Sequence, residues 1–65
     1  MINVEIFESE EDFVKITSMP VIPKREDMIG LWIKGEWRHC EIDSIVYQFD
    51  EDGNFLRVEI GVTAR

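Results

Sequence analysis

A strict alternation of apolar and polar residues near the C-terminal end of the chain constrains its fold most. Every second residue there is a branched aliphatic: Leu56, Val58, Ile60 and Val62. Successive side chains of a β-strand point to opposite faces, so this pattern indicates a strand with one buried face. Ile2, Val4 and Ile6 repeat the pattern at the start of the sequence. The chain is therefore expected to be mainly β.

Two further β segments and two turns lie between these strands. Residues 28–33 and 36–49 are rich in branched and aromatic residues, and the last strand is expected over 55–63. Lys34-Gly35 predicts a tight hairpin because glycine tolerates positive φ. The run Asp50-Glu51-Asp52-Gly53-Asn54 concentrates the residues that favour chain reversal.

The spacing of Ile42, Ile45 and Tyr47 interrupts the alternation, because two residues separate the first pair. A β-bulge or a strand break near Asp43-Ser44 would restore the phase. Five short strands with such a bend predict a small SH3-like barrel. The predicted inward set is Ile2, Val4, Ile6, Ile29, Leu31, Ile42, Ile45, Leu56, Val58 and Ile60.

The segment after the first strand is ambiguous. Ser9 could cap a short helical turn that runs to about Ile16, with Phe13 and Ile16 packing on the sheet, or residues 9–17 could form a loop. The proline-rich run 19–23 should be an extended connector or edge. The prediction is a helical turn or loop after strand 1.

The run from Pro20 to Ile29, followed by a strand, Gly35 and the pattern Ile42-x-x-Ile45-x-Tyr47, resembles the small uncharacterised barrel proteins of phages and mobile elements. The resemblance covers about two thirds of the chain and contains no catalytic motif. It implies a fold and a phage or prophage origin only. Those proteins often carry glycine before the aspartate, where this chain has Glu26.

Composition limits the function classes. A chain of 65 residues is expected to form one domain over residues 1–65, too small to enclose a cofactor, so we expect no enzyme activity and no cofactor. A single cysteine, the absence of a signal-peptide pattern and the absence of a long apolar run favour a cytoplasmic protein. The net charge of −7 disfavours direct binding to nucleic acid or to anionic membranes.

Two groups of residues resemble parts of metal-binding sites. Asp50, Asp52 and Asn54 match the first ligand positions of a calcium-binding loop, but Phe55 and Gly61 stand where that motif needs glycine and glutamate. His39 and Cys40 are single residues of their kinds and cannot form a zinc site within one chain. We expect no metal site, a surface His39 and a core Cys40.

Partner binding is the favoured function. Trp32 and Trp37 should face each other across the Lys34-Gly35 turn, where they form either an exposed anchor or a second core wall. The acidic clusters are Glu10, Glu11 and Asp12 in one turn and Asp50 and Asp52 in another. Together they predict an acidic module that binds, and can inhibit, a basic nucleic-acid-handling host protein.

Two alternatives belong to other classes. One is a homo-oligomer that sequesters a nucleotide-like ligand through Trp37, Arg38 or Arg57. The other is a structural or assembly component of a phage particle, built from exposed sheet edges. Gain of thermal stability with a metabolite would mark the first, and co-purification with virions would mark the second.

Overall fold

The computed structural model describes residues 1–10 and 12–65, and these residues form one sheet of five strands. The strands are β1 (Ile2–Glu8), β2 (Phe13–Met19), β3 (Met28–Ile33), β4 (Glu36–Phe49) and β5 (Phe55–Ala64). Their order in the sheet is β2-β1-β5-β4-β3. The mainly β prediction is confirmed.

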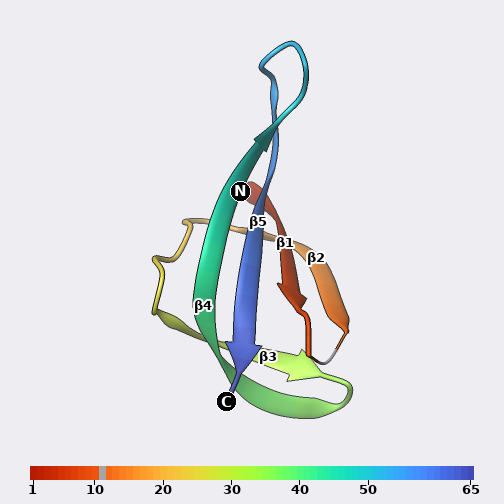
Figure 1. Ribbon diagram of the computed structural model, residues 1–65, viewed down its shortest axis with the longest axis vertical. Coiled ribbons are helices and arrows are strands. Elements are labelled where there is room, and N and C mark those ends of the chain that lie inside the picture. Colours follow the sequence, from red (N-terminus) through yellow and green to blue (C-terminus); the bar gives the residue numbers. More distant parts are fainter. Residues whose placement is uncertain (11) are drawn as a thin grey trace.

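The sheet curls into a half-barrel with two open edges (Figure 1). Its centre is the parallel pair β1 and β5, in which Val4 lies opposite Val58 and Ile6 opposite Ile60. All other neighbours are antiparallel. Strands β2 and β3 form the two edges of the sheet.

Strand β4 is long because it continues through the predicted interruption. A register shift lies between Ile42 and Ser44, so Asp43 is the extra residue of a β-bulge. The bulge returns Ile45 to the face that Ile42 occupies, opposite Ile60. Of the two predicted solutions, the bulge is correct and the strand break is wrong.

The predicted helical turn after the first strand is wrong, because that stretch contains a strand. Residues Phe13–Met19 form β2, which pairs along its whole length with β1, from Phe13 opposite Glu8 to Met19 opposite Ile2. The β-branched residues Val14, Ile16 and Thr17 suit this pairing. Before it, the Asp12 N–H lies 3.4 Å from the Ser9 carbonyl oxygen in the turn that joins β1 and β2.

The core lies on the inner face of the half-barrel. Its fully buried members are Val4, Ile6, Ile33, Cys40, Ile42, Val58, Ile60 and Val62, with Ile2, Ile29, Leu31 and Ile45 packed against them. The predicted inward set is confirmed except for Leu56, which is 42% exposed. Leu56 lies on β5 at a second register shift, opposite the Gln48–Phe49 step, where the sheet has left the core.

The turns follow their sequence signals. Lys34 and Gly35 have φ angles of 51° and 85°, which is the positive-φ pair that a two-residue hairpin requires. The last residues of the connector from 20 to 27 lie against the middle of β4. The Glu26 N–H donates to the Ile42 carbonyl at 2.8 Å, and the Ile42 N–H donates to the Asp27 carbonyl at 2.9 Å. Within the described residues there is no helix with the length and apolarity that crossing a membrane requires.

Candidate partner-binding surface

A hairpin arm projects from one end of the half-barrel. We define it as residues 46–56, the distal parts of β4 and β5 with the turn between them (Figure 1). The molecule measures 39 × 20 × 19 Å, and the arm extends along the longest of these axes. Residues 46–56 pair with neither β1 nor β3: Phe49 lies opposite Phe55, and residues 46–48 lie opposite residues 57–59 of β5. Both faces of the arm therefore meet solvent.

The arm exposes large apolar side chains on both faces. The exposed fractions are 52% for Val46, 57% for Tyr47, 58% for Phe49, 45% for Phe55 and 42% for Leu56. The rings of Phe49 and Phe55 meet edge to face, with centroids 5.7 Å apart. This contact orders the two rings without burying them, which is the state of a preformed apolar contact surface.

Asp50 organises the turn at the tip of the arm. Its Oδ1 accepts from the N–H groups of Asp52 and Asn54, both at 2.9 Å, and its Oδ2 accepts from the Asn54 side-chain amide at 3.2 Å. These hydrogen bonds, led by the backbone N–H of Asn54, hold the pKa of Asp50 below the usual aspartate value. Gly53 closes the turn with φ 84°. The Asp50 carboxylate is therefore a turn-forming group.

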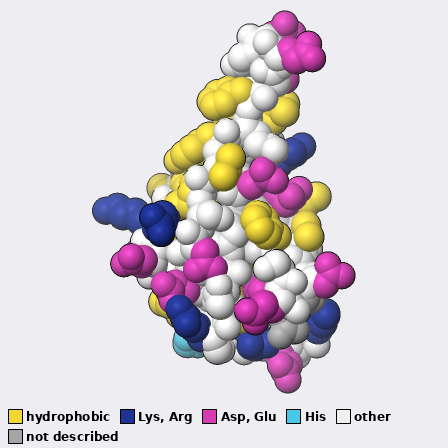
Figure 2. Space-filling view, viewed as in Figure 1, with side chains coloured by type: hydrophobic (Ala, Val, Ile, Leu, Met, Phe, Trp, Pro, Cys, Tyr) yellow, Lys and Arg dark blue, Asp and Glu magenta, His cyan; other side chains and the backbone are white. Residues whose placement is uncertain are grey.

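Glu51 and Asp52 complete an acidic tip above the apolar part of the arm. Both residues are exposed, and Figure 2 shows acidic side chains at the tip with hydrophobic side chains directly beneath them. The positive charge nearest along the strands is Arg57, whose guanidinium donates to the Gln48 side chain at 2.7 Å. Carboxylates and apolar groups thus occupy one projecting element.

Trp32 and Trp37 form a second exposed aromatic site at the opposite end of β4. They lie opposite each other in the register and meet edge to face, with ring centroids 5.6 Å apart. Their exposed fractions are 65% and 53%. Gly30 makes the arrangement possible, because a Cβ there would overlap the six-membered ring of Trp37. Of the two alternatives for this pair, the structure shows the exposed one.

The structure divides the predicted binding residues between the two ends of the sheet. Glu10 and Asp12 are exposed in the β1–β2 turn, which follows the end of β1 near the C-terminal end of its parallel neighbour β5. Asp50 and Asp52 precede β5 and lie at the other end. Glu11 lies outside the described residues. The two acidic clusters therefore do not form one surface.

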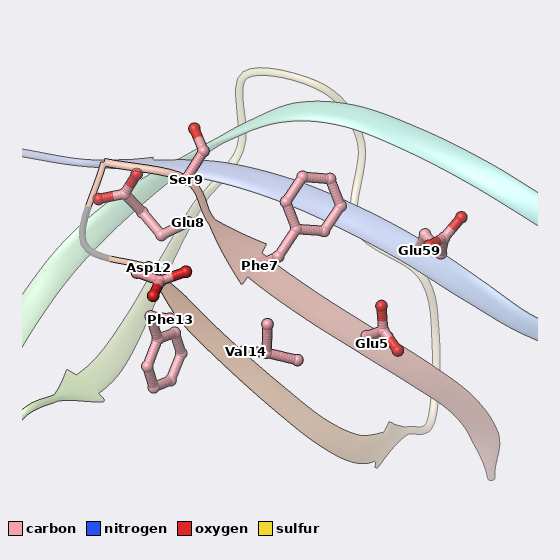
Figure 3. A pocket seen from close by; sticks show the side chains of 8 residues that line it. All are labelled: Glu5, Phe7, Glu8, Ser9, Asp12, Phe13, Val14 and Glu59. Atoms are coloured by element: carbon pink, nitrogen blue, oxygen red, sulfur yellow. The ribbon is translucent and has the colours of Figure 1, made fainter.

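A surface hollow of about 340 Å³ adjoins the β1–β2 turn (Figure 3). Four carboxylates and two phenylalanines are prominent among its lining residues: Glu5, Glu8, Asp12, Glu59, Phe7 and Phe13. Glu8 is only 3% exposed, and its Oε1 accepts from the Glu10 N–H at 2.8 Å. So many carboxylates make the hollow unsuitable for a phosphate-bearing ligand.

The residues predicted for a nucleotide-like ligand do not converge. Trp37 lies at the start of β4, whereas Arg57 pairs with Gln48 near the other end of that strand. The Arg38 guanidinium lies 4.0 Å from Glu36, close to Trp37. Among residues 1–10 and 12–65, no three acidic, histidine or cysteine side chains are placed to hold a metal ion.

Sequence reasoning missed the apolar part of the arm. Val46, Tyr47, Phe49 and Phe55 were not predicted as contact residues, and Leu56 was predicted as core. A signal was present, since residues 45–49 are apolar on both faces of the strand except at Gln48, whereas a half-buried strand is apolar on one face. Comparisons with protein-family models, curated proteins and solved structures find no match.

Proposed function

We propose that this protein is a non-enzymatic acidic binding module that inserts its hairpin arm into an apolar groove of a basic protein. The observation that supports this most directly is the arm itself, which exposes five large apolar side chains beneath an acidic tip. An exposed apolar patch bordered by charge marks an interaction site more often than a structural surface.

The arm has the properties of an energetic anchor. Aromatic residues dominate interface hot spots, and Tyr47, Phe49 and Phe55 lie close together on the arm. The hairpin register and the Asp50 turn already fix their positions, so little conformational entropy is lost on binding. The arm therefore supplies the salt-insensitive part of the affinity.

The charges define the chemistry of the partner. With 14 acidic and seven basic residues, the protein attracts a positively charged surface at long range. Glu51 and Asp52 at the tip place carboxylates next to the apolar contact, where lysine and arginine side chains around a groove would meet them. A basic nucleic-acid-handling host protein fits this description, and blocking its basic surface would inhibit it.

The experiment measures binding kinetics at two salt concentrations with a partner first isolated from host lysate. Replacing Phe49 and Phe55 by Ala should speed dissociation by about thirtyfold, the equivalent of about 2 kcal/mol. Replacing Glu51 by Gln and Asp52 by Asn should slow association and reduce its salt dependence, because exposed charges steer encounter. Asp50 is left intact because it forms the turn.

Matched controls lie at the opposite end of the sheet. Trp37→Ala removes an aromatic residue of similar exposure, and Glu10→Gln removes an exposed carboxylate. Both should leave the arm-dependent rates unchanged. If Trp37→Ala speeds dissociation while the arm variants do not, the Trp pair is the contact and the arm proposal is wrong.

The SH3-like assignment stays a prediction. The described sheet is a curled half-barrel with β2 and β3 at its edges. An experimental structure with hydrogen bonds between these two edge strands would support a closed SH3-like barrel, and one with both edges free would contradict it.

A further inference from the structure

Strand β2 is an edge strand that nothing in the described chain covers. It is the last strand of the sheet, and its one hydrogen-bonded neighbour is β1. Five consecutive residues, Val14 to Ser18, are exposed, so solvent meets both faces of the strand. Among the described residues, no loop or side chain makes a hydrogen bond to its backbone. Its free edge therefore presents unpaired N–H and C=O groups.

The charge on β2 differs from the charge on the rest of the protein. The chain has a net charge of −7, yet residues 13–19 contain no carboxylate and one basic residue, Lys15. Two apolar side chains on the outer face are unusually open: Val14 is 59% exposed and Ile16 is 75% exposed. A second acidic molecule that pairs along this strand therefore meets no carboxylate on residues 13–19.

We propose that two copies of this chain associate through antiparallel pairing of their β2 strands, with Ile16 at the twofold axis. In this register Ile16 faces its own counterpart, Lys15 faces Thr17, Val14 faces Ser18 and Phe13 faces Met19. No two like charges lie opposite each other, which is the condition that cross-strand pairing sets. The result is one continuous sheet across both molecules.

Pairing through β2 alone produces a closed dimer and not an open chain of molecules. Pairing of β2 with the other edge, β3, would leave free edges at both ends and continue into a polymer. Pairing of β2 with β2 uses the same strand twice and closes after two molecules. It also leaves both arms free, so the dimer and the arm-bound complex are compatible.

Salt distinguishes this association from the proposed function. Two molecules of net charge −7 repel each other, and salt screens this repulsion. Dimerisation should therefore strengthen as salt rises, whereas binding of the acidic arm to a basic partner should weaken. Failure of one proposal leaves the other untouched.

The first test is the molecular mass in solution, measured by light scattering over a range of protein concentrations. The mass should rise from 7.7 kDa toward twice that value, at lower protein concentration when salt is higher. Ile16→Lys puts two lysines opposite each other and should raise the dimer dissociation constant about tenfold or more. Val21→Lys also adds one lysine, at a residue that is 69% exposed and lies outside β2, and it should leave the dimer dissociation constant unchanged.

The second test reads the register through disulfide formation, and each chain keeps its fold because the substituted side chains are exposed. Ile16→Cys should cross-link to itself when oxidised glutathione is added, because the Cα atoms of directly opposed residues lie within the range that a disulfide spans. A mixture of Lys15→Cys and Thr17→Cys chains should cross-link faster than either chain alone. The native Cys40 does not compete because it is fully buried.

Three outcomes would overturn the proposal. The first is a monomeric mass at every protein and salt concentration, and the second is a mass that grows beyond that of the dimer. The third is an equal dimer dissociation constant for Ile16→Lys and Val21→Lys. Val46→Cys, which is 52% exposed on the arm, is the positional control for the second test. Faster cross-linking through Val46→Cys than through Ile16→Cys would place the contact on the arm.

Discussion

Cys40 is fully buried, and its surroundings set the chemistry of its thiol. Burial raises the pKa of Cys40, the positive charge of Arg38 opposes this effect, and the negative charge of Glu8 adds to it. The thiol sulfur lies 3.9 Å from the Arg38 carbonyl oxygen. The neutral thiol therefore behaves as a small apolar core residue.

The raised pKa of Cys40 makes stability depend on pH in the alkaline range. The folded state holds the proton more tightly than the unfolded state, so the stabilisation is full below the ordinary thiol pKa. It is lost as pH rises through the folded pKa. Urea unfolding at pH 7 and at pH 10 measures this effect. Between these pH values the free energy of unfolding should fall more for the native protein than for Cys40→Ala. Equal losses in the two proteins would show that the thiol makes no contribution.

At the residue scale, the sequence predicts well which face of the sheet a side chain occupies. It predicts poorly how far that side chain is buried. Cys40 as core, His39 as surface and most of the inward set follow from the period-two pattern. Leu56 has the same phase as Val58 and Ile60 but is exposed, because the alternation does not report where the partner strands end. Glu26 has a φ of 75°, a conformation that glycine adopts most easily. A glutamate at this position does not predict that conformation.

At the element scale, β5 combines two functions along one strand. Its C-terminal part contributes Val58, Ile60 and Val62 to the core, and its N-terminal part forms one side of the arm. The same inner-face phase therefore passes from buried to exposed within a few residues. Equivalent truncations at the two ends should have different consequences.

Ile60→Ala should lower the free energy of unfolding by about 2–4 kcal/mol, because Ile60 is fully buried. Leu56→Ala should cost less than about 1 kcal/mol, because its side chain is already half in solvent. Urea denaturation of both variants measures the difference. Equal costs would show that the arm packs on the core in solution.

Strand β2 is the element that the sequence did not predict, and its position at the edge of the sheet explains why. An edge strand exposed on both faces has no alternation of apolar and polar residues, and the spacing of Phe13 and Ile16 fits a helical turn equally well. Its conformation depends on pairing with β1, which is a contact that local sequence does not encode. The bulge at Asp43 was predictable because it breaks an otherwise regular pattern.

At the scale of the whole molecule, the sequence predicted the types of residue in the candidate site but not their arrangement. It singled out the aromatic pair at Trp32 and Trp37 and the acids Asp50 and Asp52. The structure places these at opposite ends of β4 and adds apolar residues beside the second set. The distance between the ends follows from the continuity of β4, which the sequence left undecided.

The parallel pairing of β1 with β5 also fixes how the molecule resists mechanical force. Because the strands run in the same direction, the start of β1 and the end of β5 lie at opposite ends of their shared ladder, from Val4–Val58 to Phe7–Gly61. Tension applied to the two ends of the chain therefore slides one strand along the other and loads all the ladder hydrogen bonds together. Tension applied across the β4–β5 hairpin instead opens the hydrogen bonds between β4 and β5 one after another. Single-molecule pulling should therefore record a higher rupture force in the first geometry than in the second.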